Sequence, residues 1–185
     1  AEVERLAQEG KLVIGPWYVL PDEFLVSGES LVRNLRLGRE VAREFGGQPS
    51  AAGFACDMFG HNSQMPQILK GFDIKGALVW RGSNQIEKRH FVWVAPDGTE
   101  MPTYRFGHVG YCSFASFVRH SFSQDYPFDA DTARANLEEF IRFEAEHTEM
   151  DPILLFDGGD HQEWDQEVYP VVAERLGQPT DEAEI

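Results

Sequence analysis

The sequence predicts an α/β fold built on a mostly parallel β-sheet. Short apolar runs of strand length alternate with helical patterns along the chain, which is the arrangement that produces parallel βαβ units. Three of these runs, at residues 52–56, 77–80 and 153–156, are almost entirely apolar, as strands covered on both faces are. Two of the three are followed by aspartates, and ligands of such sheets bind at the carboxyl ends of the strands. We therefore expect the chemistry at those ends.

The first part of the chain predicts two strands and one clear helix. Residues 11–14 end in the apolar run Leu-Val-Ile and precede a Gly-Pro turn, so they predict a strand. Ser27 is a suitable N-cap, apolar side chains recur after it at helical spacing, and a Gly-Gly pair ends the pattern at residue 46. Residues 52–56 then predict a strand that carries Asp57 at its carboxyl end.

The rest of the chain continues the alternation. The predicted elements are a short helix at 63–69, a strand at 77–80, a hairpin of strands at 90–94 and 103–106, a long aromatic loop at 106–128 with at most one helical turn, a helix from 129 or 131 to 147, a strand at 153–156 and a terminal helix at 166–176. A Pro-Asp-Gly turn joins the two arms of the hairpin, which predicts that they are antiparallel.

The composition excludes several classes of protein. The chain has 185 residues, with 16 Lys and Arg against 31 Asp and Glu, and therefore a net charge of −15. Nucleic acid and anionic lipid are bound mainly by Lys and Arg, so neither is an expected partner. No apolar run approaches the roughly 20 residues that span a bilayer, so no membrane segment is predicted.

The length and the cysteines predict a single cytoplasmic domain. A chain of this length fits one domain. Cys56 and Cys112 make no disulfide framework and no zinc-binding spacing, which favours a reducing, cytoplasmic setting. The first nine residues resemble the end of a helix that Gly10 stops, so we expect residues 1–185 to be a fragment of a larger domain.

The first candidate site follows the strand at 52–56. Asp57 and His61 are separated by a Met-Phe-Gly turn, and both side chains are able to bind zinc or transfer protons. The structural alternative is that Asp57 accepts backbone N–H groups while His61 fills a polar pocket. Arg81, after the next strand, would either hold the ionised Asp57 carboxylate by a bidentate contact or form an ordinary ion pair.

The second candidate site is the DGGDH sequence at residues 157–161. Its glycines allow a sharp turn that presents Asp157 or Asp160 in a crevice, where partial desolvation suits a general acid. The alternative is a tight turn whose aspartates cap the next helix. Two carboxylates from separate strands suit glycoside hydrolysis, in which one attacks or activates water and the other protonates the leaving oxygen. Motifs of serine hydrolases, nucleotide-binding loops and zincin metalloproteases are absent from the sequence.

Several strings, in the expected order, resemble the catalytic domain of glycoside hydrolase family 38, the α-mannosidases, and most of all its bacterial members. They are GPWYVLPDE at 15–23, SGESLVRNL at 27–35, DMFGH at 57–61, QMPQIL at 64–69 and WRG at 80–82. The resemblance implies an irregular (β/α) barrel of parallel strands and a retaining, zinc-dependent α-mannosidase. Residues 1–185 would then be a fragment of the N-terminal catalytic domain.

The resemblance also assigns roles to single residues. Asp57 matches the aspartate that is both nucleophile and zinc ligand, and Arg81 matches the arginine that supports it. Asp160 matches the acid/base carboxylate. Asp157 competes for that role, because the DGGDH turn departs from the paired-aspartate form of the eukaryotic members.

The implied substrate is a mannose-containing oligosaccharide, which Tyr111, Arg81 and His161 are expected to contact. The implied reaction is a double displacement with retention, and the implied setting is mannose metabolism. The family's N-terminal His-x-Asp zinc motif and its downstream histidine ligand have no match here, so we expect this fragment to bind zinc weakly and to be inactive alone. We expect oligomers of the full-length parent to form largely through domains outside this chain.

Two other functions stay open. One is a carbohydrate-binding domain that kept the fold without the catalysis, and the other is a different metal-assisted hydrolase on a similar barrel, such as a deacetylase. Loss of aryl-mannoside hydrolysis in an Asp57→Asn enzyme that still binds zinc would favour the mannosidase.

Overall fold

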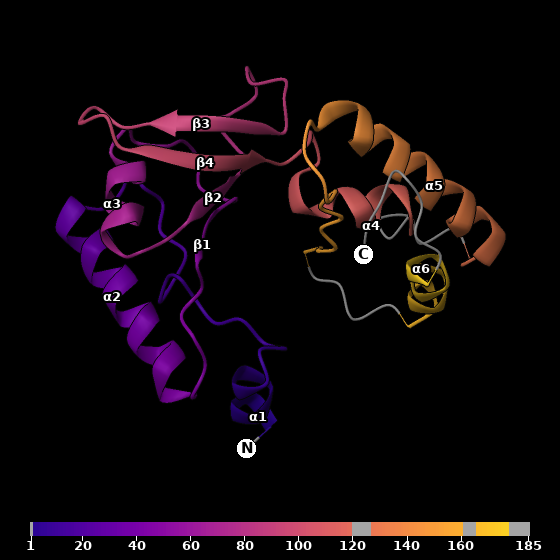
Figure 1. The fold of residues 1–185 in the computed structure, drawn as a ribbon, viewed down its shortest axis with the longest axis horizontal. Coiled ribbons are helices and arrows are strands. Elements are labelled where there is room, and N and C mark those ends of the chain that lie inside the picture. Colours follow the sequence, from indigo (N-terminus) through magenta and orange to yellow (C-terminus); the bar gives the residue numbers. More distant parts are fainter. Residues whose placement is uncertain (1, 120–126, 161–165, 178–185) are drawn as a thin grey trace. The chain divides into compact units, whose positions relative to one another are not determined.

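The protein is described here by a computed structural model, which covers residues 2–119, 127–160 and 166–177 (Figure 1). Its internal contacts divide the chain into unit 1, which is Ala1–Ile86 with Phe91–Arg105, and unit 2, which is Glu87–His90 with Phe106–Ile185. The single domain predicted from the length stays a prediction. None of the helices in the described ranges is long and apolar enough to cross a membrane.

Unit 1 holds the sheet and three helices. Its elements are α1 (Glu2–Gln8), α2 (Gly28–Glu44), β1 (Ala52–Ala55), α3 (Met65–Gly71), β2 (Gly76–Val79), β3 (His90–Val94, of which His90 belongs to unit 2) and β4 (Glu100–Arg105). All were expected within a few residues of these bounds.

The strands form one four-stranded sheet in the order β1-β2-β4-β3. β1 pairs with β2 in parallel, with Ala52 opposite Gly76, and β2 pairs with β4 in parallel, with Ala77 opposite Thr103. Figure 1 shows β3 running opposite to β4 at the edge of the sheet. The predicted α/β class with a mostly parallel sheet is therefore confirmed.

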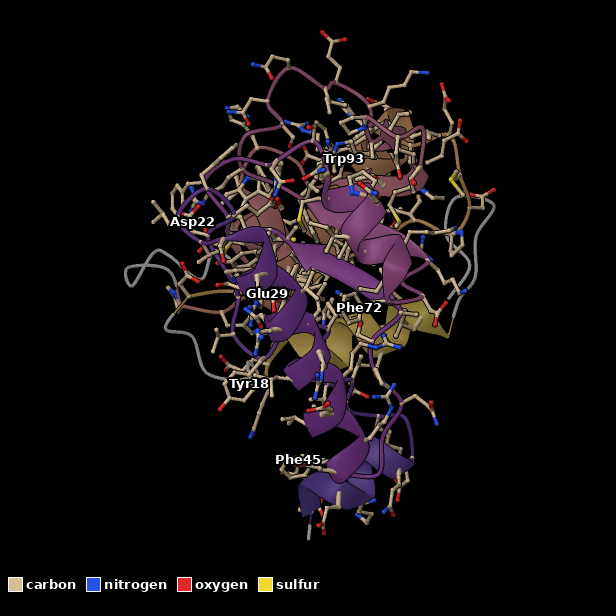
Figure 2. All side chains as sticks on the ribbon, turned by 90° about the vertical axis from the view of Figure 1, so that its left-hand side faces the viewer. Tyr18, Asp22, Glu29, Phe45, Phe72 and Trp93 are labelled. Carbon is tan, nitrogen blue, oxygen red and sulfur yellow. The ribbon has the colours of Figure 1, made fainter. Side chains whose placement is uncertain are left out.

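The helix α2 forms for the local reasons that its sequence indicates. The Ser27 side chain accepts a hydrogen bond from the Ser30 amide and caps the first turn. Gly46 adopts a φ of 76°, which ends the helix in the left-handed conformation that glycine favours. Figure 2 looks onto this helix, with Glu29 near its start and Phe45 at its end.

One hydrophobic core joins α2 and α3 to the sheet. Its fully buried members are Leu35, Ala55, Met58, Met65, Leu69, Ile74 and Met101. Because residues from both helices and from β1 and β4 meet in this core, it fixes the loops that follow the strands.

The strand predicted at residues 11–14 is wrong. The structure has a single parallel bridge there, between Ile14 and Pro49, in which the Ser50 amide donates to the Ile14 carbonyl. In this register the next ladder bond would come from the amide of residue 16, and Pro16 has no N–H to donate, so the ladder stops at Ile14.

Unit 2 is helical in its regular parts. Its elements are the 3₁₀ turn η1 (Gly110–Cys112) and the helices α4 (Ser113–Phe117), α5 (Ala130–His147) and α6 (Val168–Leu176). Asp129 caps α5 by accepting a hydrogen bond from the Thr132 amide at 2.8 Å. Of the two predicted cap positions, 129 and 131, the structure has the first. A second core gathers Phe114, Val118, Leu137, Ile141, Val168 and Val171.

Two expectations for unit 2 differ from the structure. The predicted loop at 106–128 contains η1 and α4, because Phe114 and Ala115 are buried on one face of a short helix. Residues 153–156 are not a strand: no strand within residues 2–119, 127–160 or 166–177 pairs with them. Their apolar character instead serves packing, since Ile153 and Leu155 lie against the second core.

Candidate active site

Charged side chains gather at the carboxyl edge of the parallel strands in unit 1. Asp57 follows β1 by two residues, Arg81 follows β2 by two residues, and Arg105 is the last residue of β4. Parallel strands end at the same edge, which is where the sheets of α/β proteins bind their ligands. This edge is the candidate active site of unit 1.

Asp57 and Arg81 form an ion pair at this edge. The Nε of Arg81 donates to Oδ1 of Asp57. This single contact corresponds to the ordinary ion pair, the second of the two arrangements that the sequence leaves open, and not to the bidentate one. The guanidinium lies 4.1 Å from the ring centre of Trp80 and 4.9 Å from that of Phe59, so two aromatic rings limit its movement. Asp57 stays 34% exposed, which leaves an oriented carboxylate that a ligand can reach.

The cysteine beside this aspartate is not reactive. Cys56 is fully buried, and burial raises the pKa of its thiol, with a smaller contribution from the charge of Asp57. Because the thiolate is the reactive form, Cys56 has a structural role.

The segment before α2 is fastened to the sheet and to the helix. Trp17 donates from Nε1 to the Phe54 carbonyl at 2.7 Å. The Asn34 side chain accepts from the Tyr18 amide at 2.7 Å and donates to the Val19 carbonyl at 2.7 Å. These bonds fix the course of the chain from Tyr18 toward Asp22 (Figure 2).

Glu23 and His61 make a buried polar cluster behind the ion pair. The Nδ1 of His61 lies 2.9 Å from Oε1 of Glu23, and its Nε2 lies 2.8 Å from the Arg81 carbonyl oxygen. The Glu23 side chain is fully buried and the His61 side chain is 10% exposed. Both ring nitrogens are thus engaged by protein atoms, so His61 has the polar-pocket arrangement and offers no lone pair to a metal.

Sequence reasoning did not find Glu23 and Arg105. Glu23 stands in a string that carried the family resemblance, but nothing in its spacing marks it as buried. Arg105 is 6% exposed and donates from Nε to the Ser83 carbonyl at 3.1 Å. A signal for Arg105 was available, because Met101, Thr103 and Arg105 alternate along one buried face of β4.

The second candidate site lies in unit 2. The Tyr111 hydroxyl donates to Oδ1 of Asp160 at 3.0 Å. Asp157 pairs instead with Arg119 at 2.9 Å, and the Arg119 side chain is only 6% exposed. A cation stabilises the charged form of Asp157, which is unfavourable for a proton donor. The contacts therefore favour Asp160 over Asp157 as the acid, while His161 lies outside the described residues.

A side chain at residue 158, between these two aspartates, would crowd Tyr111. A Cβ on Gly158 would lie 3.3 Å from Cδ2 of Tyr111 and 3.3 Å from the Tyr111 carbonyl oxygen. The absence of a side chain at residue 158 lets the ring approach the turn that carries Asp160.

Comparison with known proteins decides the family. Residues 1–177 match the sequence profile of the N-terminal domain of the family 38 glycosyl hydrolases. The chain belongs to glycosyl hydrolase family 38. The resemblance carried by residues 15–82 is thereby confirmed.

The similar proteins are named as glycosidases. A putative mannosylglycerate hydrolase of Halalkalibacterium halodurans is 33% identical over 88% of this chain, and an α-mannosidase of Saccharomyces cerevisiae is 30% identical over 55% of it. The crystal structure of an α-mannosidase from Enterococcus faecalis covers 98% of this chain with a TM-score of 0.80 and 27% identity. The chain spans 18%, 10% and 20% of the lengths of these three proteins.

One residue at this edge could serve as a ligand of the zinc ion expected from the family resemblance. Asp57 is accessible and carries a hard carboxylate oxygen, which suits zinc. Within the parts of the chain that the structure describes, no three His, Cys, Asp or Glu side chains cluster as a metal site. Since zinc takes at least three protein ligands, these residues fit one corner of a zinc site and not the whole of it.

Proposed function

We propose that this family 38 chain belongs to a retaining α-mannosidase that removes terminal α-mannosyl residues. The observation that carries the proposal is the Asp57 carboxylate, exposed, oriented by Arg81 and placed at the carboxyl edge of a parallel sheet. The names of the similar proteins support a mannosyl substrate.

The proposed reaction is a double displacement. Asp57 attacks the anomeric carbon and forms a mannosyl ester, while Asp160 gives a proton to the departing oxygen. Asp160 then takes a proton from water, which attacks the same carbon and releases Asp57 with the original configuration restored. Arg81 fixes the direction of the attacking oxygen, and Tyr111 holds the Asp160 carboxyl through its hydroxyl.

We further propose that Asp57 supplies one ligand to a zinc ion. Zinc would polarise sugar hydroxyl groups as a Lewis acid. Two or more further ligands would have to come from residues other than those described, so no step of the reaction is derived through the metal.

The proposal is tested by hydrolysis of an aryl α-mannoside by the full-length gene product. Asp57→Asn keeps the shape and one oxygen but removes the nucleophile, so kcat should fall by about 10³-fold or more. Asp131→Asn makes the same chemical change on a side chain that is 94% exposed and should leave kcat unchanged. Proton NMR of the first product should show the α-anomer.

The possible outcomes separate the competing functions. Mannose binding without any hydrolysis would support a carbohydrate-binding domain. Full activity of Asp57→Asn would remove this residue from the nucleophile role, and release of acetate from an acetylated sugar would support a deacetylase.

A second substrate is favoured by one comparison. The putative mannosylglycerate hydrolase matches 88% of this chain, a larger share than the yeast α-mannosidase matches. The values of kcat/KM for mannosylglycerate and for an α-linked mannobiose, measured side by side, decide whether the leaving group is a small acid or a sugar.

A further inference from the structure

The His61 ring joins three segments of unit 1 that are far apart in the sequence. Its Nδ1 contacts Oε1 of Glu23 at 2.9 Å, and its Nε2 contacts the Arg81 carbonyl at 2.8 Å. The other Glu23 oxygen accepts from the Asn62 amide at 2.7 Å. The buried Glu23 carboxylate thus binds the loop after β1 at two points, His61 and Asn62. The His61 imidazole in turn binds the loop after β2 through the Arg81 carbonyl.

The two loops also meet at the level of the backbone. Gly82 has a φ of 76°, and a Cβ there would lie 3.1 Å from the Gly60 Cα. The Arg81 amide donates to the Cys56 carbonyl at 3.4 Å, which is a long hydrogen bond. The bond from His61 to the Arg81 carbonyl is therefore the shorter of these two attachments of the Arg81 main chain.

The donor pattern fixes which nitrogen carries a proton. A carbonyl oxygen only accepts, so Nε2 of His61 must donate to Arg81. This holds whether the remaining proton of the pair is on Nδ1 or on Glu23, since either arrangement satisfies the 2.9 Å contact.

We infer that the Glu23–His61 pair is a positioning device for the nucleophile. It holds the Arg81 main chain through the Nε2–H bond, so that the Arg81 guanidinium meets Asp57 in one orientation. His61 is a positioning residue and not a catalytic one, because it acts through Arg81. The inference rests on the proposed function of Asp57.

A purely structural role for His61 is the alternative that a test must separate. The ring also packs edge-on against Trp93, with 5.5 Å between ring centres, so its removal disturbs packing as well. Loss of activity in His61→Ala would not distinguish the two roles.

Two amide substitutions divide the contacts of His61. In His61→Gln the amide nitrogen reaches the position of Nε2 and can still donate to Arg81. In His61→Asn the amide nitrogen takes the position of Nδ1, which keeps the Glu23 contact and loses Arg81. If the pair positions Arg81, the kcat of the full-length His61→Gln enzyme should stay within about tenfold of the wild-type value. The kcat of the His61→Asn enzyme should fall about 10²-fold, and KM should change little in both variants.

A double-mutant cycle with Arg81→Lys tests whether His61 acts through Arg81. The lysine cannot make the Nε contact, so His61→Asn should cost little more activity in that background. Equal losses in Gln and Asn, or additive losses in the cycle, would overturn the inference. Near-UV circular dichroism identifies any variant that fails to fold, in which case the Gln variant alone carries the comparison.

Crystal structures of the Gln and Asn variants give a readout that needs no activity. The Arg81 Nε to Asp57 Oδ1 contact should persist in Gln and be lost in Asn. If wild type hydrolyses no mannoside, the proposed function fails, while these structures still decide whether His61 holds Arg81. An intact contact in both variants would overturn the inference.

Discussion

The three aspartates of the candidate sites differ in their partners. Asp57 meets the Arg81 guanidinium and remains accessible, which suits a carboxylate that must stay charged and attack. Asp157 meets a nearly buried arginine, Arg119. Asp160 accepts a hydrogen bond from the Tyr111 hydroxyl, which is a neutral donor.

This difference predicts which aspartate is the acid. A leaving group that departs readily as an anion needs no proton, so Asp160→Asn should retain most of its first-step rate on a dinitrophenyl α-mannoside. On a methyl α-mannoside the same variant should lose about 10²-fold or more. Asp157→Asn is the matched control and should show no such dependence on the leaving group. The reverse pattern would assign the acid role to Asp157.

At the scale of the elements, α2 carries the loop that places Glu23. The helix approaches this loop at Gly38, where a Cβ would lie 2.3 Å from the Pro16 carbonyl oxygen and 2.4 Å from the Trp17 carbonyl carbon. These are backbone atoms, which cannot yield as a flexible side chain would. The close approach is possible because residue 38 is a glycine.

Gly38→Ala should therefore destabilise the protein by about 1–3 kcal/mol, the usual cost of overpacking. Gly28→Ala is the control, because a Cβ at that residue has no atom within 4 Å and the residue belongs to the same helix. The control should be neutral or stabilising by about 0.5–1 kcal/mol. Urea unfolding of both variants measures the difference, and equal stabilities would contradict the close approach.

A buried ion pair fastens residue 89 to α5 in unit 2. Arg89 donates to both carboxylate oxygens of Glu144 at 2.8 and 2.9 Å, and both side chains are at most 5% exposed. Glu144→Gln leaves the guanidinium buried without its counter-charge, so it should cost about 3–5 kcal/mol of unfolding free energy. Glu149→Gln breaks the exposed pair with Lys88 and should change the unfolding free energy far less, because water screens this pair. Similar costs for the two variants would contradict the burial of the first pair.

The elements were predictable where local signals agree with the tertiary structure. The cap at Ser27, the cap at Asp129 and the apolar runs of β1 and β2 are local, and all were found. The strands expected at 11–14 and 153–156 are wrong because an apolar run does not show whether a neighbouring backbone is placed to continue a ladder beside it. Ile14 faces Pro49, and Ile153 packs on helices instead of pairing.

The candidate site was predictable in part for a similar reason. Asp57 and Arg81 stand in strings that mark the family, and parallel strands bring them to one edge. The link through Glu23 and His61 depends on side-chain directions across 38 residues of sequence, which no spacing encodes. Tyr111 was expected to contact substrate, and in the structure its hydroxyl donates to Asp160.

At the scale of the whole molecule, the proposed zinc ion would take one ligand, Asp57, from the described residues. The full-length gene product should contain about one zinc ion per chain by elemental analysis. Asp57→Ala removes the proposed ligand oxygen and should lower the zinc content. Asp57→Asn keeps one oxygen, so its activity should fall by a much larger factor than its zinc content. Unchanged zinc content in Asp57→Ala would exclude Asp57 as a ligand.

The central claim is that Asp57 forms a covalent bond to the sugar. A fluorinated mannosyl substrate with a good leaving group slows the second step, so the ester accumulates and is identified by mass spectrometry of proteolytic peptides. The account predicts one added fluoromannosyl group on the peptide that contains Asp57, and none in Asp57→Asn. A label on another carboxylate, or turnover of mannosides without any label, would contradict it.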